Sequence, residues 1–341
     1  MIYGHGDDGY LLKQKLKADF SSNVFYGGMP EGLRLHLQSC LNKIENYPES
    51  NAQSLQEEIG QWHALSASNV LVSNGATEAF YLIAQAFKTY TATVITPAFA
   101  EYEDACLAAG LQTEFLSWNL LNENAVFKTD LVFLGNPNNP SGDIISKEIL
   151  TQVLSKNPQT VFVVDEAYAD FCSVSVSMVP ALKDCDNLIV VKSLTKTYAI
   201  PGLRLGYLLS HPHTIQKILK IKMPWSVNAL AIEAGLYIAR NRKDLALPLG
   251  LLLEDTNELI RQIRQIDNFE VCATHTNFFL CKTLNGTASK LKEFLIEKHA
   301  LLIRDASNFK DLGPQHFRIA TQRREKNELL ILGLTAWMKN F

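Results

Sequence analysis

The sequence predicts an α/β fold, with a large domain built on a mostly parallel sheet and a smaller α+β domain after it. Between residues 70 and 209, short apolar runs alternate with longer amphipathic segments. This alternation is typical of strands joined by crossover helices. The expected strands cover residues 70–72, 93–96, 131–134, 160–164, 188–191 and 205–209, with helical patterns such as 79–87 and 147–154 between them.

The smaller domain is predicted from the pattern that follows. A long amphipathic segment at residues 247–266 indicates a helix that leaves the large domain. The expected elements beyond it are short strands at 277–280, 301–303 and 316–319 and helices at 288–298 and 325–338. We therefore expect a large domain at residues 31–245 and a small domain at 246–341, with residues 1–30 as an arm packed near the small domain.

The bulk composition excludes several classes of protein. The net charge of −3 over 341 residues provides no field that would favour nucleic acid or an anionic membrane. No apolar run is long enough to span a bilayer, and the first residues lack the pattern of a signal peptide. The six cysteines form no Cys-x-x-Cys and the eight histidines form no His-Glu-x-x-His. We expect a cytoplasmic protein with reduced thiols and no metal site.

Polar motifs follow five of the expected strands. They cover residues 73–78, 97–102, 135–142, 165–168 and 193–196. Ligands of open α/β sheets bind beyond the carboxyl ends of the strands. Five polar motifs at that one edge therefore predict a single pocket for a small molecule.

The motif around Lys196 identifies the chemistry of this pocket. Ser193 and Thr195 precede the lysine, Arg204 follows it, and Asp165 ends an earlier strand. Each of these residues is uninformative alone. Together they match the requirements of pyridoxal phosphate: a lysine to bind the aldehyde, hydroxyls and an arginine to hold the phosphate, and an acid to pair with the pyridine nitrogen.

The phosphate of this cofactor has a second expected binding element. Gly75, Ala76 and Thr77 precede a helical run, where backbone N–H groups favour an anion and glycine permits its close approach. The same tripeptide is also compatible with a plain helix cap.

Three further side chains are suited to the cofactor ring. Asn139 and Tyr168 can donate hydrogen bonds to its phenolic oxygen, although Asn139 lies in a run that is turn-rich in any protein. Tyr102 can stack on the pyridine ring, with ordinary core packing as the alternative.

These motifs resemble those of a known family. Residues 136–142, 165–168 and 193–196, together with Arg204, are similar to class I/II PLP-dependent aminotransferases of fold type I, and the resemblance covers nearly the whole chain. Residues 96–102, 192–207 and 223–231 resemble a narrower branch, the threonine-phosphate decarboxylases of cobalamin biosynthesis and the related histidinol-phosphate aminotransferases. Tyr168 departs from the decarboxylase pattern, which has phenylalanine there, and agrees with the aminotransferases.

The resemblance also implies how a doubly anionic substrate is bound. Arg318 matches the family's carboxylate-binding arginine, Arg304 matches a contact to the substrate phosphate, and His5 is a second candidate for that contact. Either arginine could instead be a solvated surface charge. Tyr47 matches a tyrosine that reaches the cofactor phosphate of the partner subunit, which implies a homodimer with shared sites.

The function expected from this resemblance is decarboxylation of O-phospho-L-threonine to (R)-1-aminopropan-2-yl phosphate, with Lys196 and Asp165 as catalytic residues. The alternative is a transaminase of a phosphorylated substrate such as histidinol phosphate. The two reactions differ in which bond at the substrate's Cα breaks, and the motifs do not decide between them. A non-catalytic binding module is disfavoured because both catalytic residues are present.

Overall fold

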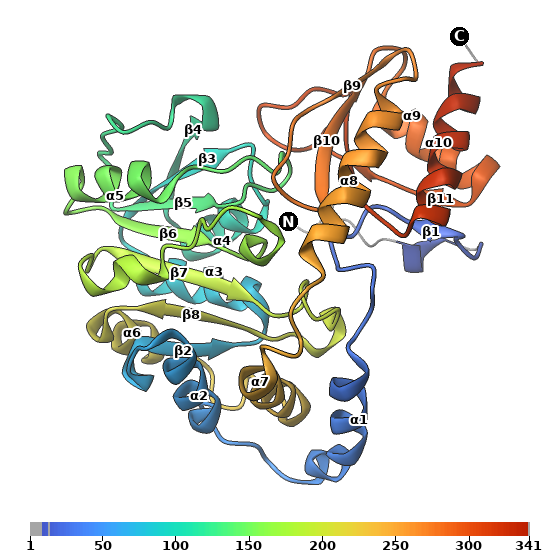
Figure 1. Ribbon diagram of the computed structural model, residues 1–341. Coiled ribbons are helices and arrows are strands. Elements are labelled where there is room, and N and C mark those ends of the chain that lie inside the picture. Colours follow the sequence, from blue (N-terminus) through green and yellow to red (C-terminus); the bar gives the residue numbers. More distant parts are fainter. Residues whose placement is uncertain (1–8, 13, 340–341) are drawn as a thin grey trace.

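The larger lobe of the computed structural model is built on a seven-stranded sheet, counted over the described residues 9–12 and 14–339 (Figure 1). The strand order is β2-β8-β7-β6-β5-β3-β4, and β8 runs antiparallel to both of its neighbours while the other pairs are parallel. The expected mostly parallel sheet is thus confirmed. Its strands are Val70–Ser73 (β2), Thr91–Thr96 (β3), Gln112–Ser117 (β4), Leu131–Gly135 (β5), Val161–Asp165 (β6), Leu188–Ser193 (β7) and Gly206–Ser210 (β8).

Helices bury both faces of this sheet. Side chains of α2 (Gln53–His63), α5 (Lys147–Lys156) and α7 (Ala229–Asn241) share one apolar core with the strands. Side chains of α3 (Gly75–Ala86), α4 (Glu101–Ala109) and α6 (Pro212–Leu219) form the core on the opposite face. Strands buried on both faces are apolar at consecutive positions, which is why these strands stand out in the sequence.

In the seven-stranded sheet, the strand that the sequence analysis did not predict is β4, which lies at one edge. It pairs with β3 over its full length, from Thr91 opposite Gln112 to Thr96 opposite Ser117. Its six residues are exposed or half-buried, and they include Gln112 and Glu114. An edge strand with one solvated face carries no continuous apolar run, so no strand signal is visible in the sequence.

The smaller lobe packs helices on a four-stranded antiparallel sheet with the order β12-β13-β10-β9, within the residues that the structure describes. Side chains from α8, α9, α10, β10 and β13 form its core. The elements are Leu249–Ile263 (α8), Phe269–Val271 (β9), Phe278–Thr283 (β10), Ala288–Phe294 (α9), Arg304–Asp305 (β12), His316–Ala320 (β13) and Arg324–Met338 (α10), and α9 continues into a π-helical turn at Leu295–His299.

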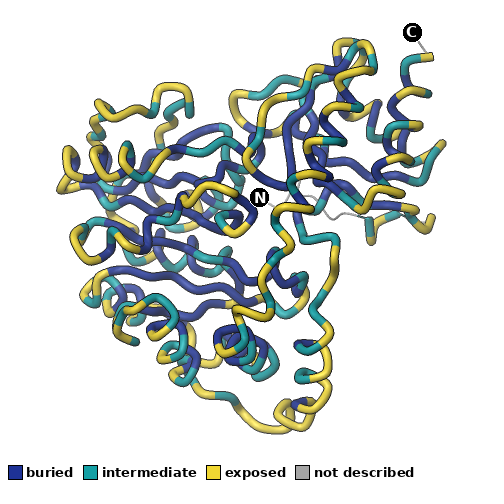
Figure 2. The backbone as a smooth tube through the Cα atoms, viewed as in Figure 1, coloured by how far each residue is buried: buried dark blue, intermediate teal, exposed yellow. Residues whose placement is uncertain are grey.

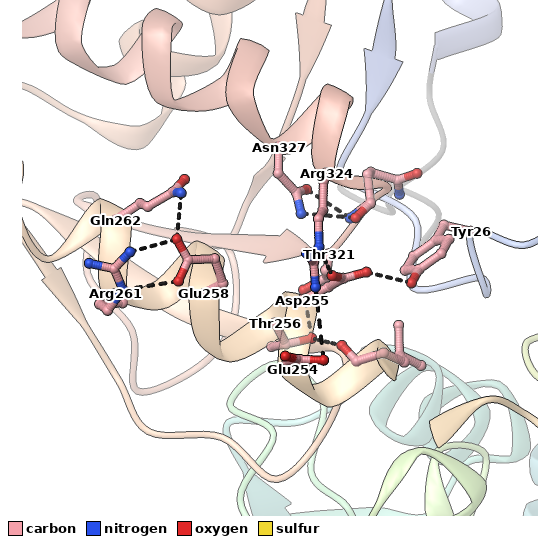
Figure 3. Close-up of polar contacts among 12 residues, drawn as sticks. Tyr26, Glu254, Asp255, Thr256, Glu258, Arg261, Gln262, Thr321, Arg324 and Asn327 are labelled. Carbon is pink, nitrogen blue, oxygen red and sulfur yellow. Dashed lines mark hydrogen bonds and ion pairs between the residues drawn. The ribbon is translucent and has the colours of Figure 1, made fainter. Parts of the chain in front are cut away.

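The segment before residue 30 is tied to the smaller lobe. Strand β1 (Ala18–Asp19) pairs in parallel with β11 (Leu301–Leu302). Further along, the Tyr26 hydroxyl donates to Asp255 Oδ2 of α8 at 2.7 Å, and Arg324 Nε of α10 donates to Oδ1 of the same carboxylate at 2.6 Å (Figure 3). Asp255 is buried, so this carboxylate holds the N-terminal segment and two helices together.

Helix α1 (Glu31–Ser39) and the following 3-10 turn Leu41–Glu45 lie away from the sheets and beside α7 (Figure 1). Their outer side chains are exposed, whereas the central strands are buried (Figure 2). Among the described residues, no helix combines the length and the apolar character that crossing a membrane would require.

Candidate active site

A cavity of about 620 Å³ lies beyond the carboxyl ends of the central strands and is lined by residues of both lobes. This is where an open α/β sheet binds its ligand. Most of the side chains expected at the site line this one cavity: Ala76, Thr77, Asn139, Asp165, Tyr168, Ser193, Thr195, Lys196, Arg204, Arg304 and Arg318. Residues from seven separate segments of the chain therefore meet as the sequence analysis expected.

One end of the cavity is built for an anion. Helix α3 begins at Gly75, whose φ is +77°, and a Cβ there would lie 2.6 Å from Arg204 Nη2. Glycine thus permits the guanidinium to lie against the first turn of the helix, where backbone N–H groups have no intrahelical partner. The hydroxyls of Ser193 and Thr195 are 2.8 Å apart and line the same cavity. A cation, two hydroxyls and a helix N-terminus form a suitable site for a phosphate.

A buried acid lies deeper in the cavity. Asp165 is the last residue of β6, and burial raises the pKa of its carboxyl to about 6, although hydrogen bonds from the Tyr102 hydroxyl and the Ala167 N–H act in the opposite direction. Those bonds measure 2.6 Å to Oδ2 and 2.9 Å to Oδ1. A carboxyl that is costly to ionise without a partner fits a ligand that brings a positive charge, such as a protonated ring nitrogen.

Tyr102 does not take the stacking position that was expected for it. It is buried, packs against Phe80, Phe99 and Phe133, and does not line the cavity. Its hydroxyl is held at Asp165 instead, so Tyr102 positions the acid. Phe99, from the same sequence motif, is among the aromatic residues that do line the cavity.

Lys192 lies in β7 and Lys196 follows that strand, and the surroundings of the two lysines distinguish them. Lys192 forms a buried ion pair with Glu166 at 2.9 Å and does not line the cavity. Burial lowers the pKa of Lys192, but Glu166 and Asp170 outweigh that effect, so its pKa is raised. Lys196 lines the cavity, and its backbone carbonyl accepts a hydrogen bond from the Phe25 N–H at 3.0 Å. Lys196 is the lysine placed to react with a ligand.

Two arginines of the smaller lobe line the cavity together. Arg304 and Arg318 are directly paired across β12 and β13, and each is only 5% exposed. Neither arginine is a solvated surface charge, so this alternative from the sequence analysis is excluded. Arg318 donates to Asn139 Oδ1 and to the Ser21 carbonyl, and its buried Nε has no hydrogen-bond partner among the described residues. Burial lowers the pKa of Arg318, which is the behaviour of a buried cation that lacks an anion.

The structure adds cavity residues that sequence reasoning did not identify. Asn308 accepts a hydrogen bond from Arg304 Nη2 at 2.8 Å, and Lys310 places its ammonium 3.6 Å from Glu103 of the other lobe. Ser21 and Asn23 come from the N-terminal segment and also line the cavity. None of these residues belongs to a sequence motif, and they reach the cavity from two stretches of the chain that lie outside the predicted motifs.

Tyr47, a further residue expected at the site, does not line the cavity either. Tyr47 is 87% exposed, and its ring lies 5.4 Å from that of Trp225 on the molecular surface. His5 lies outside the residues that the structure describes.

The fold and this arrangement of residues define a pyridoxal-phosphate enzyme. Residues 17–331 match the model of the family "Aminotransferase class I and II", and the chain belongs to that family. Pyridoxal phosphate is the cofactor of the family. The anion site at α3, the buried acid and the lysine fit its phosphate, ring nitrogen and aldehyde. When bound, it supplies an electron sink for the bond broken at the substrate's Cα.

The most informative relatives are of two kinds. The chain is similar to the crystal structure of L-threonine-O-3-phosphate decarboxylase from Porphyromonas gingivalis, with a TM-score of 0.92, 36% identity and coverage of 94% of this chain and 99% of that one. It is 31% identical to threonine-phosphate decarboxylase of Salmonella typhimurium, over 93% of this chain and 90% of that protein. It is 30% identical to histidinol-phosphate aminotransferase of Caldanaerobacter subterraneus, over 94% and 92% respectively.

Proposed function

We propose that this protein is a decarboxylase that converts O-phospho-L-threonine to (R)-1-aminopropan-2-yl phosphate and CO₂, as a step of cobalamin biosynthesis. The observation that carries the proposal is the pair of buried arginines, Arg304 and Arg318, in one cavity with Lys196. Two adjacent buried cations match a substrate that brings a carboxylate and a phosphate together. The names of the relatives above support the same substrate.

Each residue of the cavity has a proposed task in this reaction. Arg318 holds the substrate carboxylate with its guanidinium fork, and Arg304 holds the substrate phosphate. Lys196 binds the cofactor and returns a proton to Cα after CO₂ has left. Asp165 keeps the ring nitrogen protonated. Asn139 and Tyr168 are proposed partners of the phenolic oxygen, and Gly75 to Thr77, Ser193, Thr195 and Arg204 are proposed partners of the cofactor phosphate.

The less favoured reading is a histidinol-phosphate aminotransferase. Such an enzyme would use the two arginines in separate half-reactions, because histidinol phosphate carries a phosphate but no carboxylate. The observation in its favour is Tyr168, which packs against Phe278 with ring centroids 4.7 Å apart and agrees with the aminotransferase pattern. The greater identity to the decarboxylase structure, at 36%, favours the decarboxylase.

A homodimer is also part of the proposal. Exposed apolar side chains gather around Tyr47 on the turn after α1 and on the segment before α7. They are Leu41, Ile44, Tyr47, Met223 and Trp225, with exposed fractions of 53, 65, 87, 71 and 51%. We expect a second copy to cover them, so that Tyr47 reaches the cofactor phosphate of its partner. The absence of disulfides among the described cysteines accords with a cytoplasmic location.

The two arginines can be tested separately with a ligand that lacks one anionic group. Phosphoethanolamine carries the phosphate and the amine but no carboxylate. Arg318→Ala should reduce turnover of O-phospho-L-threonine strongly and should weaken binding of phosphoethanolamine much less. The two effects should differ by at least about tenfold, because a lost charge-assisted contact costs about 2–5 kcal/mol. Arg304→Ala should weaken both ligands.

The control is Arg261→Ala, which removes an exposed arginine of α8 that pairs with Glu258 and should change neither ligand. Equal weakening of both ligands by Arg318→Ala would show that this residue does not bind the carboxylate. Formation of glutamate from 2-oxoglutarate and histidinol phosphate at a comparable rate by the wild-type enzyme would favour the aminotransferase.

A further inference from the structure

Three side chains with metal-binding atoms meet where α1 packs on α7, and none of them lines the active-site cavity. His36 lies in the last turn of α1, Cys40 caps the end of that helix, and Glu233 lies on α7. The atoms His36 Nε2, Cys40 Sγ and Glu233 Oε2 all lie within 4.8 Å of one another. None of the three residues has a task in the proposed reaction.

The spacing of these atoms is compatible with a bound ion. The separations are 3.5 Å between His36 Nε2 and Glu233 Oε2, 3.6 Å between Cys40 Sγ and Glu233 Oε2, and 3.7 Å between Cys40 Sγ and His36 Nε2. The first of these is longer than a nitrogen–oxygen hydrogen bond of about 2.7–3.2 Å, and the two contacts of Cys40 Sγ also have the length of hydrogen bonds to sulfur. A tetrahedral Zn²⁺ ion with ordinary bond lengths separates its nitrogen, oxygen and sulfur ligands by about 3.3–3.6 Å.

The helices hold the three side chains in place. His36 and Cys40 are four residues apart, so they project from the same side of α1. The His36 ring stacks on Tyr237 of α7, with centroids 4.8 Å apart. A Cβ at Gly32 would lie 2.4 Å from the Tyr237 hydroxyl, so glycine at that position permits the close packing of α1 on α7. This contact fixes the imidazole opposite Glu233.

The contacts of Glu233 favour a ligand role for one of its oxygens. The Lys43 ammonium binds Oε1, which leaves Oε2 directed at His36 and Cys40. Fixing the second oxygen in this way orients a carboxylate for a metal.

An ion can also reach the cluster. A second cavity of about 250 Å³ is lined by Glu233 and Lys43, together with residues 46–49 and the first turn of α7. The His36 side chain is itself 27% exposed. A water molecule from this side would complete four-coordination around three protein ligands.

We propose that His36, Cys40 and Glu233 form a binding site for a borderline-soft divalent cation, Zn²⁺ being the best match. One thiolate, one imidazole and one carboxylate are ligands of the kind that zinc accepts, whereas Mg²⁺ and Ca²⁺ prefer oxygen alone. The ion would clamp the end of α1 to α7. The sequence analysis expected no metal site, because the third ligand lies almost two hundred residues from the other two.

The direct test is metal binding to the untagged holoenzyme, kept reduced by a phosphine so that no thiol reagent competes for the ion. One equivalent of Co²⁺ per chain should produce the near-ultraviolet band of thiolate-to-cobalt charge transfer and the visible bands of a four-coordinate ion. Zn²⁺ should displace Co²⁺ and abolish both. Titration against a chromophoric chelator then measures the Zn²⁺ affinity. A wild-type enzyme that shows no thiolate-to-cobalt band has no such site.

Substitutions locate the site and control for binding elsewhere. Cys40→Ser and Glu233→Gln should each lower the Zn²⁺ affinity by at least about 100-fold, and Cys40→Ser should remove the charge-transfer band. Cys272→Ser alters an exposed cysteine in the other lobe and should leave both measurements unchanged. Decarboxylase activity should be unaffected in all three variants. A charge-transfer band that survives Cys40→Ser, or disappears in Cys272→Ser, would place the metal at another cysteine and overturn the proposal.

Discussion

The hydroxyl of Tyr102 donates a hydrogen bond to Asp165 Oδ2 at 2.6 Å, although Tyr102 does not line the cavity that Asp165 faces. The acid proposed to pair with the ring nitrogen is thus held from behind by a buried tyrosine. This bond opposes the effect of burial on the pKa of the Asp165 carboxyl, which is nevertheless raised to about 6. Tyr102 therefore helps Asp165 to be ionised at neutral pH.

The first prediction follows from that hydrogen bond. Cofactor affinity should rise with pH as the free enzyme's Asp165 ionises, with a midpoint near its pKa of about 6. Tyr102→Phe removes a bond that stabilises the carboxylate, so the midpoint should move to higher pH by roughly one unit. Spectroscopic titration with the cofactor between about pH 5 and pH 8 measures this shift. Tyr81→Phe, which removes a hydroxyl bound to Glu101, is the matched control and should not move the midpoint.

The second prediction is that replacing Asp165 by asparagine lowers activity but raises the stability of the cofactor-free protein. Its pKa is about 6 in the folded protein against an ordinary value of 3.8, so folding takes up a proton between these pH values and stability falls as pH rises through that window. Asp165→Asn removes the ionisable carboxyl and therefore abolishes this loss of stability with rising pH. The cofactor-free variant should therefore be more stable than wild type at pH 7, by up to about 3 kcal/mol, and similar to it at about pH 4.

The same variant should lose activity by roughly 10³-fold, because no charge remains to keep the ring nitrogen protonated. Urea unfolding of the cofactor-free proteins at the two pH values measures the stability difference. A variant that is less stable than wild type at pH 7 would show that the buried carboxylate does not destabilise the fold.

The sequence alone was sufficient for the buried central strands and for the motifs that meet at their carboxyl ends. Buried strands such as Leu131–Gly135 are apolar at consecutive positions, and their polar ends mark the pocket edge. Strand β4 was missed because it is exposed at the sheet edge. Sequence order places Phe99 and Tyr102 in one motif but does not show which ring faces the cavity. That depends on the helix that begins at Glu101 and turns Tyr102 toward Asp165.

Residues that depend on contacts between distant segments were harder to anticipate. Arg304 and Arg318 were expected from the resemblance alone, and only the pairing of β12 with β13 explains why they lie together. Asn308 and Ser21 contact these arginines from separate loops without a motif of their own. The positions of the domain boundaries stay predictions.

The third prediction concerns Tyr47 and the proposed dimer. Tyr47→Ala should weaken cofactor binding, and Lys196→Ala should abolish activity. In a mixed dimer of the two variants, one site combines an intact Lys196 with an intact Tyr47 from the partner. Co-expression of the two chains should therefore restore activity at limiting cofactor, up to about one active site per mixed dimer. The measurement is activity of the isolated mixed dimer against each parent. If the mixed dimer is no more active than the parent variants, Tyr47 does not act across the interface.

The central claim is that this enzyme breaks the bond between Cα and the carboxylate of a phosphorylated amino acid. The most direct measurement is CO₂ release from carboxyl-labelled O-phospho-L-threonine by the purified holoenzyme, with no keto acid present. We expect one CO₂ for each molecule of (R)-1-aminopropan-2-yl phosphate formed, and none with Lys196→Ala. An enzyme that releases no CO₂ but forms glutamate from 2-oxoglutarate and histidinol phosphate would contradict the account.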